Sequence, residues 1–236
     1  MALALVTGAA VRVGKAIAVE LARAGYDVAV HGFSSPLDDV AADIAAAGRV
    51  ATQHRFDLSS IDGVFALADS VLAAHPVVDV VVHSAALFGQ VAFAELTVDQ
   101  WRTMQAVNVD APVFLTQRLL PGLRRSSQAC VVAIVDVMAE RPSPKYLHYC
   151  ASKAALSMVI KSLALELAPI RVNGVAPGVA AFPESFSPEK RAQIAATIPL
   201  GAGTAADVAG AVRFLCAAPH VTGQIVVVDG GMSIAL

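Results

Sequence analysis

The sequence is short of charge, of cysteine and of long apolar runs, and each shortage excludes a class of protein. Charged residues make up 15% of the 236 positions, and 17 basic against 19 acidic side chains leave a net charge of −2. Such a chain offers no basic field to a phosphate backbone, so we expect no nucleic-acid partner. Although 56% of the residues are hydrophobic, no stretch of about 18 apolar residues is free of charges and turn formers, so we expect no membrane partner.

The three cysteines are Cys130, Cys150 and Cys216, an odd number of widely spaced residues in apolar surroundings. This usage is typical of reduced core thiols in a cytoplasmic protein and does not fit a disulfide framework. We expect no bound metal. The first residues, 1–8, have no basic lead and run straight into a turn, which predicts a buried strand instead of a signal peptide.

Short apolar runs alternate with longer helical patterns through most of the chain. The runs that predict strands are Leu3–Val6, Val28–His31, Ala51–Arg55, Val78–His83, Ala129–Val135, Arg171–Val175 and Ile225–Val228. The patterns that predict helices are Gly14–Ala24, Leu37–Ala47, Val64–Ala74, Trp101–Leu123, Tyr149–Leu167 and Ala205–Cys216. Because strands of a covered parallel sheet are almost continuously apolar, we expect an α/β fold. It would be a single doubly wound Rossmann-fold domain over residues 1–236, with a seven-stranded parallel sheet and helices on both faces.

The alternation stops in residues 177–204. This region has a short helical pattern at Glu189–Ala196 and three prolines, Pro183, Pro188 and Pro199. A connection of this length in a compact domain is usually functional or disordered. Since it follows the C-terminal end of a predicted strand, where ligands of such folds bind, we expect it to form a substrate lid.

The first predicted strand leads into the turn Thr7-Gly8-Ala9-Ala10-Val11-Arg12-Val13-Gly14. Gly8 can make the tight turn, and Gly14 lets the following helix pack closely on the sheet. Exposed amides at the start of that helix attract a pyrophosphate. The middle glycine of the usual dinucleotide fingerprint is missing, and Arg12 lies in its neighbourhood.

No acidic residue ends the second predicted strand, where NAD-binding folds commonly use one to hold the ribose diol. The chain there reads Val30-His31-Gly32-Phe33-Ser34-Ser35. Arg12, with the hydroxyls of Ser34 and Ser35 and with His31, could bind a 2′-phosphate, so we expect NADP (NADPH) as the cofactor. The alternative is that Arg12 is a solvated surface residue and that the serines cap the next helix.

Tyr149-Cys150-Ala151-Ser152-Lys153 opens a helical pattern and places a phenol and an ammonium one turn apart on the same face. A nearby cation favours the phenolate and lowers the pKa of Tyr149, which suits a proton donor. Asp136 precedes Tyr149 by 13 positions and would reach the phenol if the strand end and the helix start converge. The alternative is that Asp136 caps a turn or pairs with Arg141.

Together these motifs resemble the short-chain dehydrogenase/reductase family over essentially the whole chain. The landmarks that fall in family order are Thr7-Gly8, Asp57-Leu58, Ala85, Asn108, Tyr149 with Lys153, and Pro177-Gly178. The resemblance implies that Tyr149 protonates the substrate and that Lys153 holds the nicotinamide ribose and lowers the pKa of the phenol. It further implies that Asn108 supports a proton-relay water, that Asp57 meets the adenine, and that the protein is a homotetramer. The cofactor contacts expected on these grounds are Gly8, Arg12, Val13, His31, Ser34, Ser35, Asp57, Leu58, Ser84, Ala85, Lys153, Pro177 and Gly178.

Two departures from the family pattern resemble its pteridine reductase branch, which includes bacterial dihydromonapterin reductases. Asp136 replaces the usual catalytic serine, and the turn after the first strand has lost its glycine-rich pattern. The branch implies a catalytic set of Asp136, Tyr149 and Lys153, with Phe88 holding the pterin against the nicotinamide. Phe88 could also be ordinary packing. The branch usually has Asn in place of Ser84 and Arg in place of Ser34, so the cofactor contacts would differ in detail.

We therefore expect an NADPH-dependent reductase of a pteridine of the dihydropterin or dihydrofolate type. An ionised Asp136 would oppose the negative charge that develops on a ketone oxygen, but it could stabilise a protonated pterin. The alternatives are an NADP-dependent carbonyl reductase that acts on a 3-oxoacyl group or another ketone, and a fold that binds a dinucleotide without turnover. The presence of Asn108, Tyr149 and Lys153 argues against the last alternative, because a pure binder needs no proton donor.

Overall fold

All seven expected strands form, and they make one parallel sheet in the order β3-β2-β1-β4-β5-β6-β7. The computed structural model describes residues 2–182 and 186–235, so Pro183 of the expected lid lies outside the described residues. The strands are β1 (Leu3–Val6), β2 (Asp27–Gly32), β3 (Ala51–Arg55), β4 (Val80–His83), β5 (Cys130–Ile134), β6 (Arg171–Pro177) and β7 (Ile225–Val228). The predicted α/β fold with a seven-stranded parallel sheet is confirmed.

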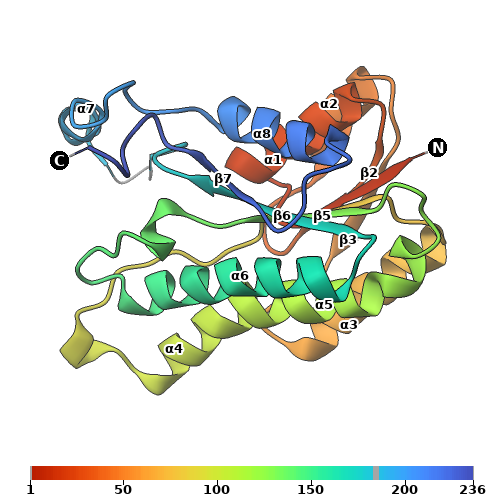
Figure 1. Cartoon of the computed structure of the whole chain (residues 1–236), viewed down its shortest axis with the longest axis horizontal. Coiled ribbons are helices and arrows are strands. Elements are labelled where there is room, and N and C mark those ends of the chain that lie inside the picture. The colour runs from red at the N-terminus through yellow and green to blue at the C-terminus, as the bar shows by residue number, and fades with distance from the viewer. Residues whose placement is uncertain (1, 183–185, 236) are drawn as a thin grey trace.

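Helices cover both faces of the sheet (Figure 1). On one face lie α1 (Arg12–Arg23), α2 (Asp38–Ala46) and α8 (Ala205–Ala217), and on the other lie α3 (Ile61–Ala74), α5 (Ala111–Leu123) and α6 (Leu147–Glu166). The remaining elements are η1 (Phe93–Glu95), α4 (Val98–Gln105), η2 (Ala106–Asp110), η3 (Val137–Ala139) and α7 (Pro188–Ala195). None of the helices in the described part of the chain is both long and apolar enough to cross a bilayer.

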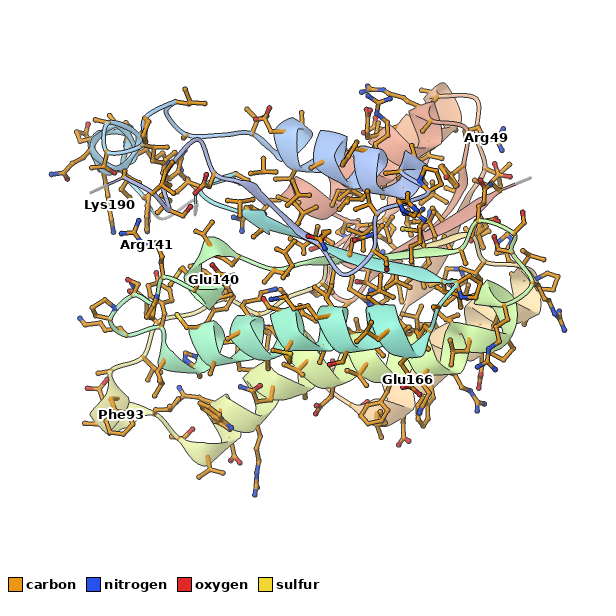
Figure 2. The ribbon with its side chains drawn as sticks, in the orientation of Figure 1. Arg49, Phe93, Glu140, Arg141, Glu166 and Lys190 are labelled. Carbon is orange, nitrogen blue, oxygen red and sulfur yellow. The ribbon has the colours of Figure 1, made fainter. Side chains whose placement is uncertain are left out.

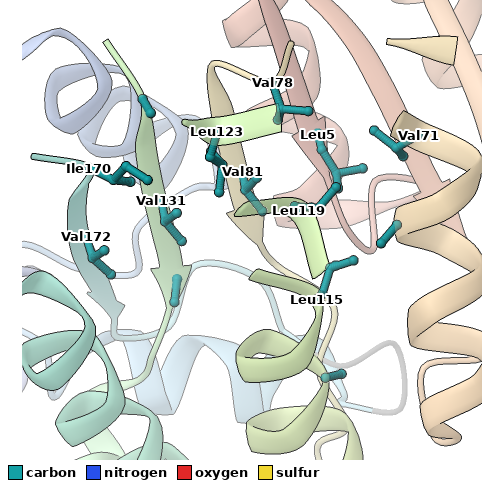
Figure 3. Close-up of a cluster of buried hydrophobic side chains, with 14 of the residues drawn as sticks. Leu5, Val71, Val78, Val81, Leu115, Leu119, Leu123, Val131, Ile170 and Val172 are labelled. Carbon is teal, nitrogen blue, oxygen red and sulfur yellow. The ribbon is translucent and has the colours of Figure 1, made fainter. Parts of the chain in front are cut away.

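Each face of the sheet has its own hydrophobic core. On the α3/α5/α6 face, Leu5 and Val81 of the sheet pack with Leu115 and Leu119 of α5, as Figure 3 shows. Burying a side chain of this size stabilises the fold by roughly 1.5–3 kcal/mol relative to leaving it exposed. The two cores fix the strands in one parallel register, so all their carboxyl ends lie at the same edge of the sheet.

The expectation of one α-helix over Trp101–Leu123 is wrong in its middle. Between α4 and α5 the chain forms the π-helical turn η2, which contains the buried Asn108. Pro112 lies at the start of α5 and has no N–H to donate, which removes one hydrogen bond of the regular α pattern. Single π turns of this kind occur frequently at functional sites.

The expected lid contains one described helix, α7, whose N-cap is Ser187: its hydroxyl accepts from the Lys190 amide at 3.3 Å. The end of the region is tied to the C-terminal turn, since the Leu200 amide donates to the Gly230 carbonyl at 3.0 Å. The helical pattern of this region is therefore confirmed, and its role as a substrate lid stays a prediction.

Candidate active site

The turn after β1 brings the ends of β1 and β4 together. Gly8 has a φ of +66°, and a Cβ there would lie 2.8 Å from the Cα of Ala85. The hydroxyl of Thr7 accepts from the amides of Ser84 at 3.0 Å and Ala85 at 3.1 Å. A Cβ on Gly14 would lie 2.0 Å from the Gly8 carbonyl oxygen, so α1 can approach the sheet this closely only with glycine. The structure thus gathers Gly8, Ser84 and Ala85 at the point where the strand order reverses, which is where such folds bind ligands.

The described side-chain hydrogen bond of Arg12 is to another segment than the serines after β2. Its Nη2 donates to the carbonyl of Ala181 at 3.1 Å, beyond the end of β6. Ser34 is exposed and Ser35 half-buried at the carboxyl end of β2, whereas Val13 is half-buried in the first turn of α1. The expected grouping of Arg12 with Ser34 and Ser35 is therefore not what the described contacts show.

His31 is buried beneath the turn, with 2% of its surface exposed. Its Nδ1 accepts from the Gly8 amide at 3.3 Å, and its Nε2 lies 3.0 Å from the Phe56 carbonyl. Burial lowers the pKa of this imidazole, which favours its neutral form. Both ring nitrogens thus have backbone partners, so His31 stabilises the turn after β1.

The other expected cofactor residues lie at the ends of β3 and β6. Asp57 accepts from the Ser59 amide at 2.8 Å, and Leu58 is buried. Pro177 ends β6, and the Gly178 amide donates to the Val228 carbonyl at 3.0 Å. The residues predicted at strand ends thus lie along one edge of the sheet, the arrangement that a dinucleotide requires.

Asp136 and Tyr149 converge as the sequence predicts. The hydroxyl of Tyr149 donates to Oδ2 of Asp136 at 2.7 Å, and Oδ1 accepts from the Met138 amide at 2.8 Å. Asp136 therefore caps the short turn η3 and binds the phenol at the same time. It does not pair with Arg141, whose Nη1 donates instead to the carbonyls of the C-terminal turn, Met232, Ser233 and Ala235. Figure 2 shows Arg141 on the side of the molecule where α7 lies.

The pKa of Tyr149 is shifted in the opposite direction from the one expected from the sequence. Burial raises the pKa of Tyr149, and the neighbouring charge of Asp136 raises it further. The expectation that Lys153 lowers this pKa is wrong, because burial has the largest effect on the phenol and the direct partner of the phenol is a carboxylate. Burial also raises the pKa of Asp136, against the opposing effects of the Met138 amide, the Tyr149 hydroxyl and the charge of Lys153.

Lys153 lies beneath the pair, with 2% of its surface exposed. Its Nζ donates to the Ile134 carbonyl at 2.8 Å and lies 5.8 Å from the centroid of the Tyr149 ring. Burial lowers the pKa of Lys153 to about 8. The site therefore contains an acid, a phenol and an amine whose pKa values are all shifted, a combination typical of active sites.

Asn108 fixes the loop after β4. Its amide nitrogen donates to the Leu87 carbonyl and to the Ser152 hydroxyl, both at 3.0 Å, and its oxygen accepts from the Leu87 amide at 2.8 Å. Leu87 precedes Phe88, whose ring meets that of Tyr149 edge-on at a centroid distance of 4.8 Å. Asn108 thus positions the loop that carries the aromatic residue expected at the substrate.

Tyr146 is a site residue that the sequence analysis missed. Its ring lies 5.1 Å from that of Phe88 and 6.4 Å from that of Tyr149. The available signal is its position three residues before Tyr149, which makes it the N-cap of α6, directly before the turn that carries the phenol. Phe88, 53% exposed, and Tyr146 form an aromatic wall beside the phenol.

Comparison with known proteins agrees with this fold. The family model described as Enoyl-(Acyl carrier protein) reductase matches residues 8–233. The uncharacterized oxidoreductase YmfI of Bacillus subtilis is 34% identical over 243 residues, which cover 97% of each chain. The 3-oxoacyl-[acyl-carrier-protein] reductase FabG of Staphylococcus aureus is 31% identical over 238 residues, again 97% of each chain. The crystal structure of acetoin dehydrogenase from Enterobacter cloacae has a TM-score of 0.90 at 31% identity, over 100% of this chain and 96% of that one.

Fold and site together define a Rossmann-fold oxidoreductase with a tyrosine and a lysine one helical turn apart. The chain belongs to the short-chain dehydrogenase/reductase family. The family expected from the sequence is thereby confirmed. The narrower resemblance to pteridine reductases finds no support in these relatives, two of which are named for 3-oxoacyl and acetoin chemistry. The carbonyl reductase alternative fits them better.

Proposed function

We propose that the chain uses NADPH to reduce a polar double bond of a small molecule, and that a ketone is its first candidate substrate. The observation that carries the proposal is the buried phenol of Tyr149, bonded to Asp136 at 2.7 Å with the amine of Lys153 beneath it. Such a phenol can deliver a proton to the oxygen or nitrogen of the double bond while the hydride adds to its carbon. The carbonyl class is supported by the relatives named for 3-oxoacyl and acetoin substrates.

The residues at the strand ends fit a nicotinamide dinucleotide, which would supply the hydride. The N-cap of α1, Val11, makes no side-chain capping bond, and the first turn of α1 has no acidic residue. Amides and helix dipole are thus available to a pyrophosphate. No acid occurs in residues 33–37, directly after β2, which supports NADPH, and the hydroxyls of Ser34 and Ser35 would bind its 2′-phosphate. Lys153 would hold the nicotinamide ribose.

The protonation of Asp136 decides how well the site serves a ketone. As hydride reaches the carbonyl carbon, the oxygen gains negative charge, which neutral hydrogen-bond donors stabilise and a carboxylate opposes. Burial raises the pKa of Asp136, so a larger share of the folded protein carries the neutral acid than an exposed aspartate would at the same pH. A protonated Asp136 donates a hydrogen bond, as the family's usual serine does, and leaves the Tyr149 proton free for the substrate.

A pteridine is the second candidate, and the ionised form of Asp136 favours it. A C=N nitrogen becomes more basic as hydride arrives, so a carboxylate beside it stabilises the protonated ring instead of opposing it. The wall formed by Phe88 and Tyr146 supports a flat heterocycle, because aromatic rings stack favourably. Tyr149 would deliver the proton directly or through Asp136.

A pH profile with two substrate classes separates these candidates. NADPH consumption is followed by absorbance, from about pH 5 to 8.5, with a small panel of ketones, including 3-oxoacyl thioesters, and with dihydrobiopterin and dihydrofolate. For ketone reduction we expect kcat/KM to fall as pH rises through the raised pKa of Asp136. For pterin reduction the rate should persist above it. Binding of NADPH without turnover of either class would overturn the proposed function.

A further inference from the structure

Arg12 has a backbone conformation that glycine adopts freely and arginine does not. Its φ is +54°, and the only other non-glycine residue with positive φ in the described chain is Lys145, at +70°. This conformation brings Cβ too close to the neighbouring carbonyl oxygen and costs free energy. Strained residues of this kind cluster at functional sites. Arg12 also occupies the neighbourhood of the missing fingerprint glycine, so the chain has an arginine where glycine would remove the strain.

The Arg12 side chain reaches across the edge of the sheet. Its Nη2 bonds the carbonyl of Ala181 at 3.1 Å, although Arg12 follows β1 and Ala181 follows β6. Two strands, β4 and β5, lie between β1 and β6 in the sheet, and β5 leads directly to Asp136. Next to Ala181, Ala180 packs against the same core that holds Val13 of α1. The contact therefore spans the strand ends at which a dinucleotide would lie.

The guanidinium keeps donors for a second partner. It has five N–H groups, and the contact with Ala181 uses one of its nitrogens. An exposed guanidinium at an uncapped helix N-terminus suits phosphate oxygens, which it can bind with two parallel hydrogen bonds. Arg12 can thus hold a phosphate and the Ala181 carbonyl together.

We propose that Arg12 is a positioning residue that clasps the segment 178–182 over the bound cofactor. Its guanidinium would bond the cofactor diphosphate and the Ala181 carbonyl at the same time, so that cofactor binding would fix the segment that follows β6. The inference rests on the proposed function for the identity of the cofactor. The strained backbone is retained because it aims the side chain across the sheet edge.

Hydrogen exchange tests the clasp with Arg12→Gly and a matched control, Lys145→Gly. Both changes place glycine at a positive φ, but only the first removes the contact with Ala181. At saturating NADPH we expect exchange of the amides in 178–182 to slow about fivefold or more in the wild-type protein and in Lys145→Gly, a modest coupling between sites. In Arg12→Gly, saturated with NADPH as judged by titration, exchange should slow less than about twofold.

Wild-type protection of residues 178–182 in NADPH-saturated Arg12→Gly would overturn the clasp and leave Arg12 as a cofactor ligand alone. If titration shows that the wild-type protein binds no NADPH, the cofactor assignment of the proposed function fails. The contact itself is then measured without cofactor. Faster exchange of these amides in Arg12→Gly than in Lys145→Gly supports the link between Arg12 and the segment, and equal rates refute it.

Discussion

The hydroxyl of Tyr149 donates a 2.7 Å hydrogen bond to Oδ2 of Asp136, and this bond ties the two protonation states together. While Asp136 is ionised, the phenol keeps its proton, because burial and the adjacent negative charge both raise the pKa of Tyr149. When Asp136 is protonated, the site becomes a pair of neutral donors. One proton on Asp136 therefore decides whether the site favours a developing anion or a developing cation.

Replacing Asp136 with serine tests this electrostatic preference. Without the carboxylate, we expect ketone turnover near pH 8 to rise about tenfold or more, and its loss with rising pH to disappear. Reduction of a dihydropterin should fall by about tenfold or more, because the stabilising negative charge is gone. Steady-state kinetics with both substrates would measure the effect, with NADPH affinity as a control for the fold. Equal turnover in variant and wild type would mean that the carboxylate is incidental.

Tyr149→Phe removes the proposed proton donor and leaves the ring in place. A positioned acid typically contributes about 10²–10⁴-fold to the rate, so we expect turnover to fall by that factor. The ring contacts with Phe88 remain available, and NADPH binding should be retained in a fluorescence titration. A variant that turns over at the wild-type rate would exclude Tyr149 as the acid.

Lys153 destabilises the fold that it serves. Burial lowers its pKa to about 8 from 10.5, so between these values the unfolded chain binds a proton that the folded chain has lost. The contribution of Lys153 to the free energy of unfolding therefore rises with pH across this window. Below about pH 8 the folded protein bears the whole destabilisation of the buried ammonium. We expect Lys153→Met to be inactive yet more stable at pH 7, by about 1–3 kcal/mol.

Urea denaturation at pH 7 and pH 10 measures this effect. The advantage of Lys153→Met over the wild-type protein should shrink as the pH rises, because the wild-type amine becomes neutral. An advantage that is the same at both values would show that the substitution acts through packing and not through charge.

The sequence predicts the sheet well where strands are buried on both sides and less well at their ends. The strand expected over Val78–His83 begins only at Val80, and the Asp79 carboxylate just before it accepts from the Leu3 amide at 2.8 Å and the Ser126 hydroxyl at 2.6 Å. The Asp79 amide also donates to the Leu3 carbonyl at 3.0 Å, and its carbonyl accepts from the Cys130 amide at 2.9 Å, so side-chain bonds add to the backbone bonds at this end. Periodicity alone does not reveal such a change, because the partners are 76 and 47 residues away.

The candidate site shows the same division. The convergence of Asp136 and Tyr149 follows from a strand end and a helix start that the sequence marks clearly. The hydrogen-bond partners of Arg12 and Asn108 could not be predicted from such signals. Arg12 depends on a left-handed backbone and Asn108 on a π turn. Both features run against local propensity, and they occur where the chain positions a functional side chain.

The buried His83 should make the stability of the fold depend on pH in mild acid. It ends β4, is buried, and its Nε2 lies 2.7 Å from the Thr116 hydroxyl. Burial lowers the pKa of His83 to about 4 from 6.5, and burial likewise lowers the pKa of His54 to about 4. Between pH 4 and 6.5 the unfolded chain binds protons at these histidines that the folded chain does not bind. The free energy of unfolding therefore decreases as the pH falls from 6.5 toward 4.

His83→Gln keeps a polar partner for Thr116 and removes the proton site. We expect the free energy of unfolding to fall less steeply with acid in this variant, by about 1.4 kcal/mol per pH unit in the middle of the window. His54→Gln is the matched variant and should reduce the slope by a similar amount. Urea denaturation at half-unit steps from about pH 6.5 to 4.5 measures the slopes. Parallel curves for His83→Gln and the wild-type protein would mean that His83 takes up its proton without unfolding, through a local opening at the end of β4.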